Sequence, residues 1–188
     1  MKERFEWLRA WCDETQNSDL PRMLLVGDSI TEGYQSLVRE KLKGKFYVDY
    51  IATSYAVDTR IYNEVVERYA RDSEYAFIHF NHGLHGFYMD GKTYEKSVYK
   101  LIKRLCVVAK VGVATSTSVY EKGLVGIDEK WAEKLAERNG AIKRISEKLG
   151  LAVDDLYSVS LSVDLKDRTE DGYHYKNYES FASAVSEF

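Results

Sequence analysis

Short apolar runs alternate along the chain with longer segments in which apolar residues recur every three or four positions. The short runs are bounded by glycine or polar residues, which predicts strands over 23–26, 46–51, 75–80, 111–114 and 151–153. The longer segments have the spacing of amphipathic helices, over 2–16, 34–43, 59–71, 92–107, 128–149 and 176–188. Strands that alternate with helices favour a parallel sheet covered on both faces. We therefore predict an α/β fold, a three-layer α/β/α sandwich with a flavodoxin-like, five-stranded parallel sheet.

Capping residues and apolar stripes refine these helices. Asp58 and Asp128 are expected N-caps, while Gly44 and Gly150 stand where helices should end. For the helix over 59–71, the predicted inward stripe is Ile61, Val65 and Tyr69. For the helix over 128–149, the predicted stripe is Trp131, Leu135, Ile142, Ile145 and Leu149.

The chain has 188 residues, a length that suits one domain with a sizeable core. We predict a single domain over 1–188, in which residues 1–20 form an N-terminal helical extension. The polar stretch over 154–175 is expected to be irregular. No internal repeat, low-complexity tract or linker divides the sequence.

Composition and charge narrow the partners and the compartment. The net charge of −3 gives no reason to expect nucleic acid or an anionic membrane surface as partner. No signal peptide and no apolar stretch of membrane-spanning length is recognisable. Cys12 and Cys106 fall in helical patterns, so we expect buried, reduced thiols and a cytoplasmic protein. No oligomeric state follows from the sequence.

The first strand breaks into Gly27, Asp28 and Ser29 before a helical pattern begins. This turn leaves a hydroxyl at the carboxyl end of a strand, where open α/β sheets have their ligand crevices. The helix N-terminus beside it favours negative charge, which suits either a nucleophile that forms an oxyanion or a bound phosphate. Ser and Asp are also preferred helix caps, so this turn by itself leaves capping open.

Other strand ends carry complementary groups. Tyr55 and Ala56 follow the second strand, Asn81 ends the third, and Asp171 and His174 stand just before the last helix. Together with the hydroxyl after the first strand, these ends bring an amide, a carboxylate and an imidazole to one edge of the sheet. A serine, a histidine and a carboxylate are the parts of an activated nucleophile, and an asparagine amide suits an oxyanion donor.

With these residues the chain resembles the SGNH hydrolases of the GDSL-type lipase/esterase superfamily. The sequence Gly-Asp-Ser-Ile-Thr-Glu-Gly at 27–33 matches the first block of that family, and the spacing of Asp171 and His174 matches its last block. The resemblance implies that Ser29 is the nucleophile, His174 the general base and Asp171 its orienting carboxylate. It also implies an oxyanion hole made by the Ser29 N–H, the Asn81 amide and a backbone N–H from the second block.

Three departures from the family pattern stand out. No glycine lies between Gly44 and Gly83, so Ala56 or a neighbour is expected to donate the second-block N–H. The third block reads His-Phe-Asn-His at 79–82, which keeps the amide and changes its flanks. Tyr175 follows the histidine where proline is common.

Several features have a structural interpretation beside a functional one. His79, His82 and His85 lack the spacing of a metal motif, so we predict no metal and no cofactor, with polar packing the favoured reading. Asp154 and Asp155 end the fifth strand and are expected to cap rather than to serve as the triad acid. The hydroxyl run at 115–118 is expected to serve turns and caps. Aromatic faces near the strand ends would suit sugar rings. The predicted substrate-contact residues are Asp28, Tyr55, His82, His85 and Tyr173.

The sequence therefore predicts a serine esterase that hydrolyses a small or carbohydrate-borne acyl ester, with acetyl the expected acyl group. Two alternatives remain open at this stage. One is an SGNH-like protein with weak turnover, which the missing second-block glycine would favour. The other is a flavodoxin-like module that binds a phosphate group at the turn of Ser29 and Thr31.

Overall fold

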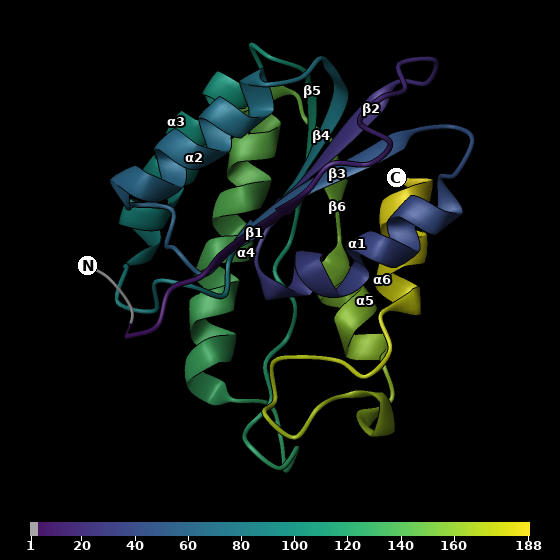
Figure 1. Cartoon of the computed structure of the whole chain (residues 1–188). Helices are drawn as coiled ribbons and strands as arrows, with labels where there is room; N and C mark the ends of the chain where they lie inside the picture. Colours follow the sequence, from purple (N-terminus) through teal and green to yellow (C-terminus); the bar gives the residue numbers. More distant parts are fainter. Residues whose placement is uncertain (1–3) are drawn as a thin grey trace.

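The computed structural model describes residues 4–188 and contains one mixed sheet (Figure 1). Its strands are β1 (Leu8–Trp11), β2 (Arg22–Gly27), β3 (Tyr47–Thr53), β4 (Tyr75–Asn81), β5 (Lys110–Ala114) and β6 (Val153–Asp154). They lie side by side in the order β1-β3-β2-β4-β5-β6. β2 to β6 run parallel to one another, and β1 is antiparallel to β3 at one edge.

The five parallel strands have the flavodoxin-like order 2-1-3-4-5 when they are numbered along the chain without β1. The direction of this order reverses between β2 and β4, and ligands of such sheets bind at the carboxyl ends of strands at this switch point. The register places Gly27, the last residue of β2, opposite Asn81, the last residue of β4. The fold therefore brings the serine turn and the asparagine together.

Helices cover both faces of the sheet, as Figure 1 shows. They are α1 (Ser29–Lys41), α2 (Arg60–Arg71), α3 (Gly91–Leu105), α4 (Glu129–Leu149), α5 (Leu156–Ser162) and α6 (Glu179–Glu187), with a 3₁₀ turn η1 (Leu165–Asp167). α2, α3 and α4 lie on one side of the sheet, while α1, α5 and α6 lie on the other. The predicted three-layer α/β/α architecture is confirmed, and the sheet has one strand more than predicted.

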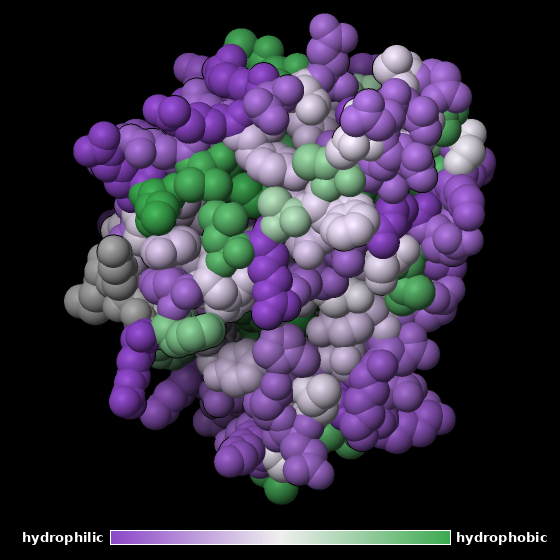
Figure 2. All heavy atoms as spheres, in the orientation of Figure 1, coloured by the Kyte–Doolittle hydropathy of each residue, from purple (hydrophilic) through white to green (hydrophobic). Residues whose placement is uncertain are grey.

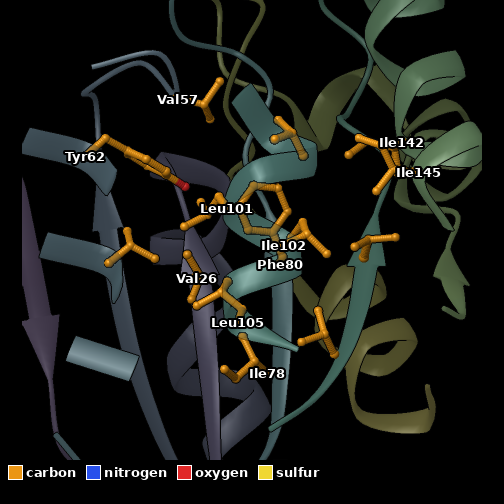
Figure 3. Packing of buried hydrophobic residues seen from close by; sticks show 14 of the residues in the cluster. Val26, Val57, Tyr62, Ile78, Phe80, Leu101, Ile102, Leu105, Ile142 and Ile145 are labelled. Atoms are coloured by element: carbon orange, nitrogen blue, oxygen red, sulfur yellow. The ribbon is translucent and has the colours of Figure 1, made fainter. Parts of the chain in front are cut away.

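The core has two parts, one on each face of the sheet. On the α2–α3–α4 side, Val26, Ile78 and Phe80 from the strands pack against Leu101 and Ile142 from the helices (Figure 3). On the other side, apolar residues of α1, α5 and α6 pack against β2 and β3. Because β2 and β4 are buried on both faces, their sequences read as nearly continuous apolar runs, which made them recognisable.

The predicted N-terminal helical extension over 1–20 is wrong for residues 4–20, because Leu8–Trp11 forms the edge strand β1, and its residues 1–3 lie outside the described residues. The apolar residues that suggested a helix face remain outside the core, with Phe5 76% and Trp11 54% exposed. Hydrogen bonding to β3 therefore decides the conformation of this segment rather than burial of an apolar stripe. A helical spacing in so short a segment does not distinguish the two.

Other local predictions also need correction. The buried stripe of α2 is Tyr62, Val66 and Ala70, one residue later than predicted, and its N-cap is Thr59 rather than Asp58. Both cysteines are free and exposed rather than buried. The stretch over 154–175, predicted to be irregular, contains α5 and η1. Because α2 has apolar residues on two of its faces, the sequence did not decide which face is buried, and the tertiary packing did.

Hydrophilic side chains cover most of the face seen in Figure 2, and apolar side chains appear there in separate patches. Within residues 4–188, no helix combines the length and the apolar character needed to cross a membrane.

Candidate active site

The turn after β2 presents Ser29 as the first residue of α1. Asp28 is the N-cap of this helix, and its Oδ1 accepts a hydrogen bond from the Ile30 N–H at 3.1 Å. A Cβ on Gly27 would lie 1.9 Å from Thr31 Oγ1 and 2.3 Å from the Asn81 carbonyl oxygen, so only glycine fits there. The glycine thus allows β2, α1 and β4 to approach closely, and capping and presentation of the hydroxyl coexist in this turn.

His174 lies against this turn. Its Nε2 is 2.8 Å from Ser29 Oγ, and its Nδ1 is 2.6 Å from Asp171 Oδ2. Partial burial raises the pKa of Asp171, but the hydrogen bonds from His174, Thr169 and two backbone N–H groups outweigh it and hold the pKa well below its ordinary value. Asp171 is therefore a carboxylate at neutral pH, and the three side chains form a continuous serine–histidine–aspartate arrangement.

Hydrogen bonds within the loop set the positions of Asp171 and His174 relative to each other. Asp171 Oδ1 accepts hydrogen bonds from the Tyr173 N–H at 2.8 Å and the His174 N–H at 3.0 Å. Thr169 closes the loop, because its N–H donates to the His174 carbonyl at 3.0 Å. Asp171 and His174 are three residues apart, and one turn therefore sets their relative position.

A buried arginine anchors the base of this loop. Arg168 is 0% exposed, and its guanidinium lies 4.1 Å from the Tyr120 ring centroid and 4.9 Å from that of Tyr175. It donates to Ser118 Oγ at 2.8 Å and to the Ser160 carbonyl. Residues of the hydroxyl run after β5 and of helix α5 thus fix the start of the loop through Arg168. The sequence reasoning missed this residue.

Asn81 ends β4 with its side chain 2% exposed. Among residues 4–188 its Nδ2 makes no hydrogen bond of ordinary geometry, although the buried Tyr34 hydroxyl is close enough to interact with this side chain. A buried amide donor left without a partner costs free energy, roughly 1–3 kcal/mol, and such groups often serve function. Opposite Gly27 in the sheet, this donor is next to the turn that carries Ser29.

The loop after β3 carries the predicted second-block residues. Ala56 is 2% exposed, and its carbonyl accepts hydrogen bonds from Thr59, so its conformation is set by the start of α2. Tyr55 is partly buried and packs against the core beside α2. The close neighbour of Ala56 is Gly86, which has a φ of 68° and where a Cβ would lie 2.7 Å from that of Ala56. A glycine from the third-block loop, rather than the second block, gives the two loops their close approach.

The remaining predicted contact residues differ in accessibility. His85 is partly exposed, 6.5 Å from the Trp7 ring and stacked at 5.7 Å on His82. Tyr173 is partly exposed, 6.5 Å from His174, and accepts a hydrogen bond from Trp131 Nε1. His82 is 1% exposed, and its ring lies 4.6 Å from that of Tyr62 and 5.7 Å from that of His85. Asp28, also 1% exposed, serves as the cap described above.

The other carboxylates and histidines have structural partners. Asp155 caps α5, as predicted. Asp154, which was also expected to cap, instead makes a buried contact with His79 Nε2 at 3.0 Å. Thr115 of the hydroxyl run accepts from the Tyr157 N–H at the start of α5. In the part of the chain that the structure describes, no three His, Cys, Asp or Glu side chains are grouped to hold a metal ion.

Known structures share this architecture. An acetylxylan esterase from Geobacillus stearothermophilus aligns with a TM-score of 0.73 and 12% identity over 89% of this chain and 92% of that one. The acetyl xylan esterase AlAXEase aligns with a TM-score of 0.68 and 18% identity over 88% and 98%. A proposed SGNH hydrolase from Slackia heliotrinireducens aligns with a TM-score of 0.67 and 15% identity over 90% and 97%. No family model and no curated protein sequence matches the chain.

These similarities define the class of fold. The chain has the fold of the SGNH hydrolases and resembles acetyl xylan esterases in architecture over nearly all its length. The resemblance predicted from the sequence blocks is thereby confirmed for the fold. At 12–18% identity the activity is a separate question, which rests on the site.

Proposed function

We propose that this protein is an SGNH-type serine esterase that hydrolyses short acyl esters through an acyl-enzyme on Ser29. The observation that carries this proposal is the chain of contacts from Ser29 Oγ to His174 Nε2 at 2.8 Å and from His174 Nδ1 to Asp171 Oδ2 at 2.6 Å. A base within hydrogen-bond reach of a hydroxyl, itself oriented by a carboxylate, is the arrangement that activates serine.

In the proposed reaction His174 removes the proton of Ser29 as the oxygen attacks the ester carbonyl. Asp171 holds the imidazole in the tautomer that has its proton on Nδ1 and stabilises the imidazolium. The imidazolium then gives its proton to the departing alcohol, which leaves the acyl group on Ser29. A water molecule, activated by His174, releases the acid and restores the hydroxyl.

The negative charge of the tetrahedral intermediate is stabilised by donors of the oxyanion hole. We assign its donors as the Ser29 N–H at the start of α1, the Asn81 Nδ2 and the Ala56 N–H. The buried Asn81 amide, whose Nδ2 makes no hydrogen bond of ordinary geometry, supports this assignment, because a preorganised donor stabilises charge that develops only in the transition state. The chemistry uses protein groups alone, so turnover is expected to withstand a metal chelator.

Acetyl esters, small or carried on a carbohydrate, are the proposed substrates. Two structural neighbours are acetyl xylan esterases by name, and the partly exposed aromatic ring of Tyr173 lies 6.5 Å from the His174 ring. We expect a cytoplasmic enzyme that acts on such esters without nucleic acid or membrane partners.

A fluorophosphonate probe and a chain-length series of p-nitrophenyl esters, with acetylated sugars added, test the proposal. The wild-type protein should be labelled once, at Ser29, and should favour acetyl over longer chains. Ser29→Ala and His174→Ala should each lose about 10⁶-fold in kcat, because members of a triad act as a unit. Ser36→Ala, an exposed serine two turns along the same helix, is the matched control and should keep full activity.

Failure to label wild-type protein would overturn the esterase proposal and favour a binding module at the same turn. Labelling with turnover only at a trace level would favour the weakly catalytic alternative, which the missing second-block glycine supports. Activity that requires added zinc would exclude the serine mechanism.

A further inference from the structure

A charged residue interrupts the apolar stripe of α4. Trp131, Leu135, Ile142 and Ile145 are buried along this helix, and Arg138 continues the same stripe between them with 0% exposure. A charged side chain is almost never buried completely unless its donors are satisfied. The partners of this arginine therefore indicate what it does.

The guanidinium of Arg138 is directed at the loop that follows Asn81. It donates to the carbonyl oxygens of Gly83 at 2.6 Å, His85 at 2.8 Å and Gly86 at 2.6 Å. A planar guanidinium can make such contacts simultaneously, whereas the ammonium of lysine is a point charge on a flexible stem. One side chain from α4 thus sets three peptide planes in a loop more than 50 residues away along the chain.

Tyr94 of α3 supports the same arrangement. Its ring lies 5.0 Å from the guanidinium, and its hydroxyl donates to the His82 carbonyl at 2.8 Å. The loop over 82–86 therefore turns four carbonyl groups toward α3 and α4. Because these carbonyls are buried away from water, they need internal donors, which the two helices supply.

The orientation of these carbonyls determines what the other side of the loop presents. In a trans peptide the C=O and the next N–H point in opposite directions. With the Gly83 carbonyl held by Arg138, the Leu84 N–H points to Asp28 Oδ2 at 3.4 Å. The same oxygen is 3.4 Å from the Gly83 N–H, and Asp28 precedes Ser29. A continuous set of contacts thus links α4, the loop and the nucleophile turn.

We propose that Arg138 is a positioning residue that holds the oxyanion side of the site in place relative to Ser29. The inference rests on the proposed function, since it assigns the residue through the reaction at Ser29. Arg138 holds the loop that begins at Asn81, and Gly86 of this loop lies close against Ala56. In this role Arg138 fixes two of the proposed donors, the Asn81 amide and the Ala56 N–H. Arg138 itself has no contact with the reacting atoms in this role.

Replacement of Arg138 by lysine tests the proposal, with kcat and KM for p-nitrophenyl acetate and the thermal midpoint as measurements. Arg138→Lys keeps the charge but not the three simultaneous contacts. We expect kcat to fall on the order of 10- to 100-fold, with KM changed less than about threefold, because a displaced donor acts mainly in the transition state. Arg144→Lys, an exposed arginine on the same helix that pairs with Glu95, is the control and should match wild type.

A double-mutant cycle separates positioning from general destabilisation. If Arg138 acts through Asn81, Arg138→Lys in an Asn81→Ala background should cost clearly less in kcat than it does in the wild type. A folded Arg138→Lys protein with normal kcat, or full additivity of the two losses, would overturn the positioning role. Wild-type protein without esterase activity would instead refute the proposed function.

A second variant guards against a lysine protein that does not fold. Tyr94→Phe removes only the hydroxyl that donates to the His82 carbonyl. We expect it to fold and to lower kcat less than Arg138→Lys, again at nearly constant KM. A folded Tyr94→Phe protein with wild-type kcat would contradict the positioning of this loop by α3 and α4.

Discussion

The two loops that meet at Ser29 are built in opposite ways. The loop over 169–175 carries the proposed acid and base and is called the acid–base loop below. It is open to water, with side chains 48% exposed at Asp171 and 39% at His174. The loop over 81–86, which carries the proposed oxyanion donor Asn81, is largely buried, with Asn81 2% and His82 1% exposed. In the first loop, hydrogen bonds that span two or three residues align Asp171 with His174, while contacts such as that of the Tyr120 N–H with the Gly172 carbonyl anchor the loop to distant segments. The conformation of the second loop depends on donors from distant helices.

The difference follows from what each loop is proposed to do. A general base exchanges protons with substrate and water in every turnover, so exposure serves it, and a local turn suffices to align Asp171 with His174. A dipole that stabilises an oxyanion has most effect where water is excluded and the donor is fixed beforehand. Local hydrogen bonds thus suffice to align an acid and a base that exchange protons with solvent. Donors that must stay fixed are held by buried contacts from distant helices.

Breaking the acid–base loop should have the largest effect. Asp171→Ala removes the carboxylate on His174 Nδ1 and is expected to lower kcat roughly 10⁴-fold at pH 7, less than the loss of the serine or histidine. Asp171→Asn retains an oxygen for the two backbone N–H groups and should lose similar activity with a smaller loss of thermal stability.

Steady-state kinetics and thermal melts of both variants check this expectation, with Asp164→Asn as an exposed control next to η1. Near-normal activity in Asp171→Asn would reassign the carboxylate to a structural role. A larger effect of Asp154→Asn, which removes the partner of His79, would move the triad acid to that residue.

The oxyanion side should show a smaller loss confined to kcat. Asn81→Ala is expected to reduce kcat by about 10²–10³, or roughly 2.7–4 kcal/mol, with KM nearly unchanged. The carbonyl of Asn81, which the Thr31 hydroxyl approaches at 3.5 Å, is part of the backbone and survives the substitution. The variant should therefore remain folded.

Asn81→Asp sharpens the comparison, because a carboxylate facing a developing oxyanion should be worse than alanine. Labelling rates at Ser29 with a fluorophosphonate give an independent measure of the same step. A normal kcat together with a lower thermal midpoint in Asn81→Ala would show that the residue only ties down its loop.

The smallest expected effect is a change in stability with pH, which tests whether water is excluded from His82 in the buried loop. Burial lowers the pKa of His82 to about 4, with the charge of Asp28 opposing the shift. The unfolded chain, with an imidazole pKa near 6.5, binds a proton more readily than the folded one between these values. The free energy of unfolding is therefore not reduced by His82 above about pH 6.5. It falls as the pH drops toward 4, by up to about 3 kcal/mol.

Denaturant unfolding between pH 4 and 7 measures this loss. His82→Gln removes the titrating group and should flatten the profile in this window. The same substitution at His85, which is partly exposed, is the control and should leave the slope in place. A wild-type profile without any slope from this window would mean that water reaches His82.

The sequence by itself determined the elements whose signals are local. Apolar runs buried on both faces located the parallel strands, helical periodicity located the helices, and the blocks around Ser29, Asn81 and Asp171 indicated the fold class. Such signals survive because each depends on neighbours within one strand, turn or helix. The pairing of Asp171 with His174 was accessible for the same reason.

Tertiary packing decided whatever depends on distant partners. Leu8–Trp11 becomes a strand because the edge of β3 is available to it, and α2 turns Tyr62 inward because of what it packs against. Arg138 looks like any charge in a helix until its carbonyl partners, 52 to 55 residues away, are in place. Periodicity reports which residues share a face, but burial of a charge depends on donors and acceptors that only the folded chain brings together.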